Sequence, residues 1–162
     1  MATDDSRSGV ERLAEFLDSH GISYEVVEHP ARSTAAADAR AAGILPHDAA
    51  KTVVLRDGDE FRIAVIPASE RLDLHKLREL LGSADTLRLA SEEEIAGHFG
   101  EFEVGALPPF APVLPAPEVL DRRLLDHERI FCSGGDHRHG VLVNPQDMVR
   151  IGQPQLADVC QD

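Results

Sequence analysis

Lys51 is the residue best placed for chemistry, because it precedes a predicted buried strand. The chain contains 14 arginines but only two lysines, Lys51 and Lys76, so arginine is its usual cation. The run Thr52–Leu55 is β-branched and apolar, which predicts a buried strand. An ammonium differs from a guanidinium in shape and loses its proton more readily, so Lys51 is a candidate for chemistry that arginine does not perform. On spacing alone, an ion-paired lysine whose stem lies along the sheet is the preferred interpretation.

A group of imidazole and acidic side chains in the C-terminal third raises the question of metal binding. These residues are His127, Asp136, His137 and His139. The His-x-His spacing can place two imidazoles on one side of a strand or loop, but a site also needs a third protein ligand and an organised second shell. Eight histidines in an acidic chain make chance clustering common. We therefore favour a solvent-exposed loop here, and we expect no metal and no cofactor.

The segment Ser133-Gly134-Gly135 offers a hydroxyl and two flexible backbone positions. Ser133 lacks the G-x-S-x-G pattern of a nucleophile elbow, and no order of Asp and His supports a catalytic triad. The N–H groups of Gly134 and Gly135 can bind an anion or a developing oxyanion, but an ordinary turn is the favoured interpretation of two adjacent glycines. Cys132 is expected on a strand as inert packing. None of these residues identifies a function by itself.

Hydrophobic periodicity predicts the helices and strands that position these residues. Helices are predicted at 10–20, 35–42, 74–81, 92–97 and 145–149, and strands at 22–27, 52–55, 60–66, 86–89, 130–133 and 141–143. Thr34, Asp73 and Asn144 are predicted N-caps, and Ser91 with Glu94 matches a capping box. Strands interrupted by helices, with hairpins present, predict the α/β class, as a mixed, partly rolled sheet surrounded by helices.

The connections between these elements are of two kinds. Asp57-Gly58 between two apolar alternations predicts a tight hairpin, and Gly134–Asp136 predicts a turn before the last strand. Residues 100–117 contain two glycines and five prolines, which exclude regular structure over much of this segment. Because aromatic and aliphatic residues are interleaved with the prolines, we expect an ordered, packed loop rather than a linker.

Length and composition indicate one soluble domain. We assign residues 10–162 to this domain and residues 1–9 to a flexible N-terminus, and we find no internal repeat. No apolar stretch approaches the roughly 20 residues of a membrane span, and the start does not resemble a secretory leader, so we expect no membrane partner. Cys132 and Cys160 are too few and too distant for a disulfide scaffold or a zinc knuckle. A cytoplasmic location is therefore expected.

The net charge restricts the possible macromolecular partners. The formal charge is −13 at pH 7, which would repel a polyanion. This charge argues against DNA, and it requires any RNA to be bound through a local patch or only at its end. Five arginines could supply such a patch, although each is more commonly a solvated charge: Arg32, Arg56, Arg122, Arg123 and Arg138.

Several short motifs, taken in order, resemble a known family. They are Tyr24–Pro30, Ser33-Thr34, Ala50–Leu55, Arg71–Leu74 with Leu77, Val104–Phe110 and Phe131–Gly135. This arrangement is similar to the YbaK/ProX family of aminoacyl-tRNA deacylases, which is related to the editing insertion of bacterial prolyl-tRNA synthetases. Each motif is short, but their order and spacing are specific, and the resemblance extends over about residues 10–160.

The resemblance implies a pocket between the strand of Lys51 and the Gly-x-x-x-Pro loop. Lys51 matches the essential lysine of the family, and Gly105 and Pro109 match the Gly-x-x-x-Pro motif. The resemblance further implies that His29, Pro30 and Thr34 wall the aminoacyl pocket, and that Ser133, Gly134 and Gly135 form its opposite rim.

The family resemblance also implies an activity, namely hydrolysis of the ester between a wrong amino acid and the 3′-terminal ribose of tRNA. We expect a trans-editing enzyme for a small residue such as alanine, serine or cysteine, acting without a covalent intermediate. Lys51 would anchor the terminal adenosine, and N–H groups near Gly105 or Gly134 would stabilise the oxyanion. Its partners would be the aminoacyl-tRNA acceptor end and, as a further candidate, an aminoacyl-tRNA synthetase. The alternatives are a non-catalytic binding module on the same fold and a metal-binding protein built on His137 and His139.

Overall fold

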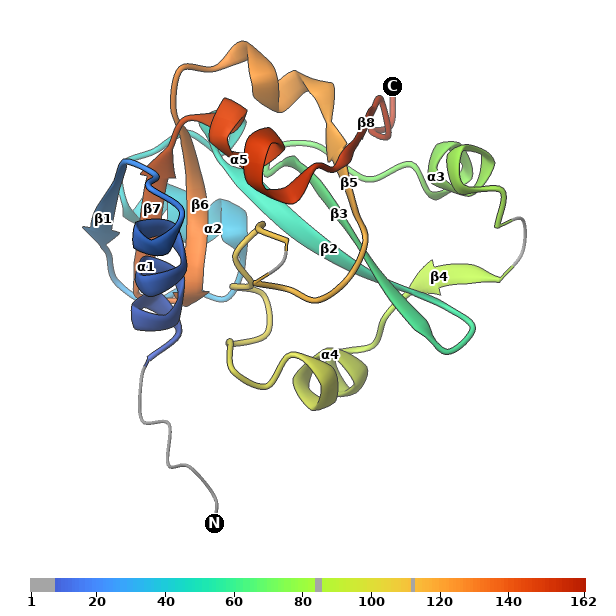
Figure 1. Ribbon diagram of the computed structural model, residues 1–162, viewed down its shortest axis with the longest axis horizontal. Coiled ribbons are helices and arrows are strands. Elements are labelled where there is room, and N and C mark those ends of the chain that lie inside the picture. Colours follow the sequence, from blue (N-terminus) through green and yellow to red (C-terminus); the bar gives the residue numbers. More distant parts are fainter. Residues whose placement is uncertain (1–7, 84–85, 112) are drawn as a thin grey trace.

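The computed structural model describes residues 8–83, 86–111 and 113–162 (Figure 1). The helices are α1 Gly9–Ser19, α2 Ala35–Ala41, α3 Leu74–Leu81, α4 Glu92–His98 and α5 Pro145–Gly152, with 3-10 helices η1 Pro46–Asp48 and η2 Arg122–Asp126. The strands are β1 Tyr24–Glu28, β2 Ala50–Asp57, β3 Glu60–Pro67, β4 Leu87–Leu89, β5 Glu118–Asp121, β6 Ile130–Asp136, β7 His139–Val143 and β8 Gln155–Ala157. Of the predicted flexible segment 1–9, residues 1–7 lie outside the described residues, while Ser8 caps α1 and Gly9 begins it. None of the described helices is long and apolar enough to cross a membrane.

The strands form two sheets that meet at one bridge. The first has the order β1-β7-β6, and the second has the order β4-β2-β3-β5-β8. The second sheet is mixed, because β5 runs parallel to β3 and β8 while β2 is antiparallel to β3 and β4. A parallel bridge between Ala49 and Phe131 joins the two sheets at the start of β2. The predicted fold class of a mixed sheet with surrounding helices is confirmed, although the strands divide into two sheets.

The β2–β3 hairpin, which the sequence predicts, lies in the middle of the larger sheet. Asp57 pairs with Glu60, which leaves Gly58-Asp59 as a two-residue turn with Gly58 at φ 62°. A positive φ at this position favours glycine, since it has no Cβ. Apolar side chains from both faces of β2 enter hydrophobic clusters, which explains why the strand is apolar at consecutive positions.

The helices begin at the predicted caps. The side chains of Thr34, Asp73 and Asn144 each accept a hydrogen bond from a backbone N–H in the first turn of the following helix. Ser91 and Glu94 form both hydrogen bonds of the predicted capping box. These interactions are local in sequence, which is why the sequence predicts them correctly.

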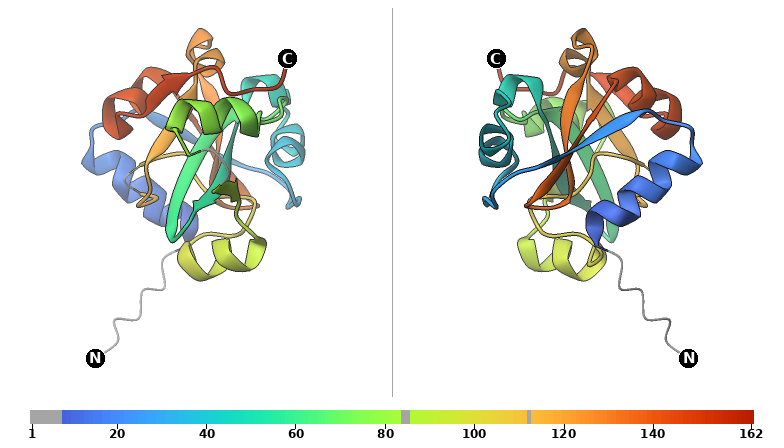
Figure 2. Two further views of the ribbon diagram at one scale, coloured as in Figure 1. Left: turned by 90° about the vertical axis from the view of Figure 1, so that its right-hand side faces the viewer. Right: turned by 90° about the vertical axis from the view of Figure 1, so that its left-hand side faces the viewer.

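Helices α1 and α2 cover opposite faces of the three-stranded sheet (Figure 2). Leu13 and Leu17 of α1 pack against Cys132 of β6 in the main core. Ala39 of α2 packs against Phe131, the preceding residue of β6, in a separate cluster. Because successive side chains of a strand point to opposite faces, β6 presents alternate residues to the two helices.

The described residues of the proline-rich segment 100–117 pack onto the sheet, as predicted. Three of its apolar residues are buried among those of β2 and β3: Phe102, Leu107 and Leu114. The turn predicted at Gly134–Asp136 is wrong, because these residues extend β6 and the hairpin turns at 137–138, with an irregularity in the register between Ser133 and Asp136. Strand β5 was not predicted, since it has only four residues and takes its conformation from β3 and β8 on either side.

Candidate functional site

The loop that carries Gly105 is held against strand β2 by a side-chain hydrogen bond. Thr52 Oγ1 donates to the carbonyl oxygen of Leu107 at 3.0 Å. Thr52 is the residue after Lys51, so the loop lies beside the strand of the predicted essential lysine. Pro109, which completes the Gly-x-x-x-Pro motif, is buried. The loop therefore packs against the strand that carries Lys51.

His137 ties the same loop to helix α2. Its Nδ1 lies 2.6 Å from Asp38 Oδ2, and its Nε2 lies 2.8 Å from the carbonyl oxygen of Val104. Burial opposes the charge on the ring and lowers its pKa. The hydrogen bonds to Asp38 and Val104, together with the charge of Glu103, outweigh this effect, so the pKa of His137 is raised. A carbonyl oxygen only accepts hydrogen bonds, so Nε2 carries a proton, and the raised pKa favours an imidazolium that donates to both partners.

Gly105 is enclosed by the groups that His137 organises. Its φ is 86°, in the region that favours glycine. A Cβ at this position would lie 3.1 Å from the carbonyl oxygen of Ser33 and 3.2 Å from Cε1 of His137. The Gly105 N–H donates to none of the described residues, and the glycine is exposed to solvent. The loop therefore presents a backbone donor next to the N-terminus of α2.

Lys51 lies on β2, one residue before Thr52, and its ammonium has no hydrogen-bond partner or ion pair among the described residues. The side chain is half-buried. Desolvation lowers its pKa, and the charge of Arg71 lowers it further, whereas the charge of Glu70 opposes the shift. Strand alternation places Lys51 on the face of β2 opposite to Thr52 and to the loop that Thr52 holds, the face on which Val53 and Leu55 pack with Leu77 of α3. An unpaired, partly desolvated ammonium is suited to bind an anion.

The segment Ser133-Gly134-Gly135 lies on β6 and contacts two neighbouring segments closely. Ser133 is buried on the face of β6 that Phe131 presents to α2, and its hydroxyl bonds to no described residue. A Cβ on Gly134 would lie 2.7 Å from the carbonyl oxygen of His139. The Gly135 N–H donates to the carbonyl oxygen of Ala106 at 3.0 Å, so it joins β6 to the Gly105 loop. Gly135 thus has a packing role in addition to any contact with a ligand.

His29, Pro30 and Thr34 surround the start of α2. The ring of His29 is buried beside Phe131, with 5.9 Å between the ring centroids, and its Nδ1 lies 3.0 Å from the carbonyl oxygen of Pro30. Thr34 accepts from the Ala37 N–H at 3.1 Å and is exposed. These residues and Ser133 thus border the same helix.

The residues that connect these parts are not among the site residues predicted from the sequence. Asp38 is buried on α2 and accepts both from the Arg32 N–H at 3.1 Å and from His137. A single aspartate among the alanines of α2 was the one feature of the sequence that could have indicated a buried carboxylate, which is unusual. His137 was considered only as a metal ligand, and Thr52 only as a strand residue.

The structure separates the histidines that the sequence analysis grouped. Both ring nitrogens of His137 are bonded, one to Asp38 and the other to the carbonyl oxygen of Val104. His139 Nδ1 lies 2.9 Å from Asp136 Oδ1, and its Nε2 lies 3.6 Å from Glu28 Oε1. His127 lies on a different part of the surface, 3.3 Å from Asp48.

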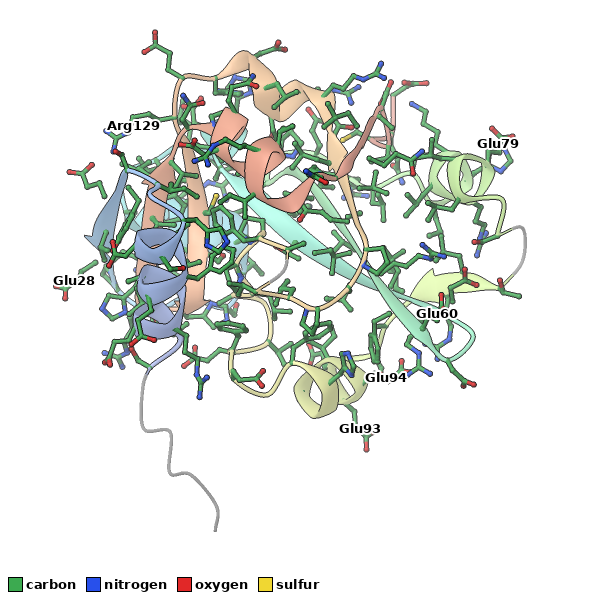
Figure 3. All side chains as sticks on the ribbon, viewed as in Figure 1. Glu28, Glu60, Glu79, Glu93, Glu94 and Arg129 are labelled. Carbon is green, nitrogen blue, oxygen red and sulfur yellow. The ribbon has the colours of Figure 1, made fainter. Side chains whose placement is uncertain are left out.

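Two of the five arginines considered for a basic patch are paired with carboxylates. Carboxylates extend from separate elements around the molecule, and those of Glu28, Glu60, Glu79 and Glu93 are labelled in Figure 3. Of the five arginines considered for a patch, Arg56 pairs with Glu94 at 3.2 Å. Arg123 pairs with Asp121 and Asp158. Both guanidinium charges are therefore largely neutralised, while Arg32, Arg122 and Arg138 are exposed.

The chain is similar to known proteins in both sequence and structure. The model of a family described as "Aminoacyl-tRNA editing domain" matches residues 29–151. The proline–tRNA ligase of Shouchella clausii (strain KSM-K16) is 32% identical over 133 residues, which are 82% of this chain but only 23% of the ligase. A crystal structure described as a proposed trans-editing enzyme for prolyl-tRNA synthetase is 28% identical with a TM-score of 0.83, and the match covers 96% of this chain and 99% of the other. The structure of a hypothetical protein is 26% identical with a TM-score of 0.83, over 93% and 99% of the two chains.

Proposed function

Because the chain belongs to the family of aminoacyl-tRNA editing domains, we propose that it hydrolyses the ester of mischarged aminoacyl-tRNA. The substrate would be the acylated 3′ end of a tRNA that carries a small amino acid such as alanine, serine or cysteine. Water would attack the ester carbonyl and release the free amino acid and the tRNA. This reaction takes place during translation, which is consistent with a cytoplasmic protein.

The observation that carries the proposal is the unpaired Gly105 N–H on a loop fixed by Thr52 and His137. A pre-oriented backbone donor stabilises an oxyanion without reorganisation during the reaction. The contacts of Thr52 with Leu107 and of His137 with Val104 hold both sides of Gly105. We assign the Gly105 N–H as an oxyanion donor, with Gly134 as a second candidate. His137 is a positioning residue in this scheme, since both of its nitrogens are already bonded.

Lys51 would bind the phosphate or ribose of the terminal adenosine. Its ammonium has no hydrogen-bond or ion-pair partner among the described residues, so an incoming phosphate would be its first direct counter-ion. Desolvation makes an unpaired ammonium costly, and this cost is relieved when an anion binds. Contact limited to the acceptor end would also reconcile tRNA binding with a net charge of −13.

No covalent enzyme intermediate is required. An aminoacyl ester is already activated, so positioning the water and stabilising the oxyanion can suffice. Among the candidate nucleophiles, burial raises the pKa of the Cys160 thiol to about 12, and the pKa of Cys132 is raised even further by burial. Ser133 has no base within hydrogen-bond distance among the described residues. His29, Pro30, Thr34, Pro109, Ser133 and Gly135 would contact the substrate.

We infer that the protein acts in trans. The support is the similarity to a solved structure described as a proposed trans-editing enzyme for prolyl-tRNA synthetase, at 28% identity and a TM-score of 0.83. A synthetase could be a partner that supplies the positive charge needed for tRNA binding.

The test is a panel of mischarged tRNAs incubated with the wild type and with Lys51→Ala. The matched control is Lys76→Ala, which removes the other lysine of the chain, one that is bonded to the carbonyl oxygen of Cys160 and to Asp162. We expect deacylation by the wild type and by Lys76→Ala, and at least a hundredfold slower deacylation by Lys51→Ala with an unchanged circular dichroism spectrum. Full activity of Lys51→Ala would refute the role of the lysine. Failure of the wild type on every tRNA, with tight binding of a free small molecule, would favour a non-catalytic binding module, which the acidic surface also fits.

A further inference from the structure

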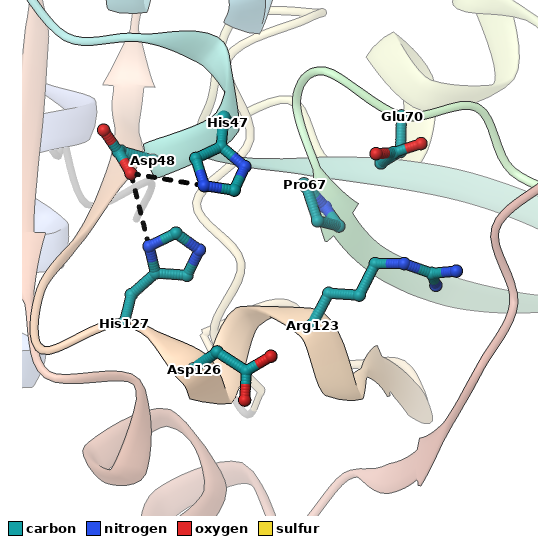
Figure 4. A pocket seen from close by; sticks show the side chains of 7 residues that line it. All are labelled: His47, Asp48, Pro67, Glu70, Arg123, Asp126 and His127. Atoms are coloured by element: carbon teal, nitrogen blue, oxygen red, sulfur yellow. Dashed lines mark ion pairs between the residues drawn. The ribbon is translucent and has the colours of Figure 1, made fainter.

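A second group of potential ligands lies in a cavity away from the Gly105 loop. We propose that His47, Asp48 and His127 form a binding site for a divalent transition-metal ion, with Zn²⁺ as the ion that the ligand set fits best. His47 and Asp48 belong to η1, and His127 follows η2 (Figure 4). This inference does not depend on the proposed hydrolysis.

The three side chains converge on one point. Asp48 Oδ1 lies 3.3 Å from His127 Nδ1 and 3.9 Å from His47 Nε2. Ligand atoms of all three residues lie within 4.8 Å of one another. In a tetrahedral zinc site with bonds of about 2 Å, neighbouring ligand atoms lie roughly 3.3 Å apart. The distance between His127 and Asp48 already matches this spacing, and the His47 side chain is 70% exposed, so it has room to move toward the other two.

The nitrogens of these two imidazoles have no hydrogen bond to a described residue. Their contacts are the ion-pair distances to Asp48 and a ring contact with each other at 4.9 Å between centroids. This distinguishes them from His137, whose nitrogens bond to Asp38 and Val104. It also distinguishes them from His139, whose Nδ1 bonds to Asp136. The lone pairs of His47 and His127 therefore remain available to a metal ion.

The cavity around the three residues has the charge that a cation requires. Its volume is about 360 Å³, and Glu70 and Asp126 line it together with the three ligands. Arg123 also lines the cavity, but its guanidinium pairs with Asp121 at 3.0 Å and with Asp158 at 2.8 Å. Its positive charge is therefore already compensated. The net charge of −13 further favours the approach of a cation.

The ligand set determines the class of metal. Two imidazoles with one carboxylate suit Zn²⁺ and related transition ions, whereas Mg²⁺ and Ca²⁺ prefer oxygen ligands alone. Three protein ligands leave coordination positions open to water. The ligand nitrogens come from segments about 80 residues apart in sequence, so a bound ion would also link η1 to η2.

The test is direct titration of the full chain with zinc chloride after removal of metals with a chelator. Isothermal titration calorimetry should detect one Zn²⁺ per chain. His47→Ala and His127→Ala should each weaken binding at least tenfold, while His75→Ala, which removes another exposed histidine, should bind as the wild type does. Because His47 is largely exposed, its variant is expected to fold even if His127→Ala does not.

Cobalt substitution gives an independent measurement. Bound Co²⁺ should give visible absorption bands without near-ultraviolet thiolate charge transfer, because both cysteines are buried and free. Zinc should raise the melting temperature of the wild type and of His75→Ala, but not that of His47→Ala. Absence of zinc binding by the wild type, or equal binding by His47→Ala, would overturn the proposal.

Discussion

Glu118 should make the protein less stable as the pH rises. This residue begins β5 and is only 7% exposed. Its Oε1 accepts from the Ala111 N–H at 3.1 Å, and its Oε2 has no hydrogen-bond partner among the described residues. Burial raises the pKa of Glu118 from 4.5 to about 7, although the Ala111 N–H partly opposes this shift.

The size of the effect follows from the two pKa values. A carboxyl whose pKa is higher in the folded state binds its proton more tightly there, so protonation stabilises the fold. That stabilisation is present below pH 4.5 and is lost as the pH rises to about 7. One pKa unit corresponds to about 1.4 kcal/mol, so the loss between pH 5 and pH 8 is about 2–3 kcal/mol.

Urea denaturation of the wild type and Glu118→Gln at pH 5 and pH 8 would measure this. Glutamine keeps the acceptor for Ala111 and has no charge to bury. We expect the two proteins to have similar free energies of unfolding at pH 5, and the variant to be more stable at pH 8 by about 2 kcal/mol. The control Glu128→Gln alters an exposed carboxylate and should show no such difference. A stability difference between Glu118→Gln and the wild type that does not change with pH would refute the reasoning.

Three further predictions concern the loop and helix α2. Gly105→Ala forces a Cβ against Ser33 and His137 at positive φ, so deacylation should fall at least tenfold in single-turnover assays. Gly43 is also at positive φ, but no atom lies near the added Cβ, so Gly43→Ala should retain activity. Because the pKa of His137 is raised, its pairing with Asp38 stabilises the fold most below pH 6.5 and is lost as the pH rises through the folded pKa. His137→Asn should remove that component in pH-dependent melting, and His98→Asn should not. Thr34→Ala should lower the free energy of unfolding by about 1 kcal/mol in urea, whereas Thr34→Ser should not.

Local patterns in the sequence determined most of the helices and the central hairpin. Thr34, Asp73 and Ser91 bond to N–H groups within three residues, so their effect depends on nearby sequence alone. The hairpin at Gly58 follows from the preference of glycine for positive φ. The order of the short motifs also predicted the family, which the comparison confirms. The roles of Lys51, Gly105 and the other site residues remain predictions.

Only the tertiary structure decided how the site is organised. Asp38 and His137 are 99 residues apart, and nothing in either local pattern indicates that they are bonded. His47 and Asp48 likewise approach His127 only because η1 and η2 border the same cavity. Strand β5 and the position of the β6–β7 turn depend on pairing partners elsewhere in the chain. Local propensity acts over a few residues, whereas these contacts form only when distant segments pack around a shared core.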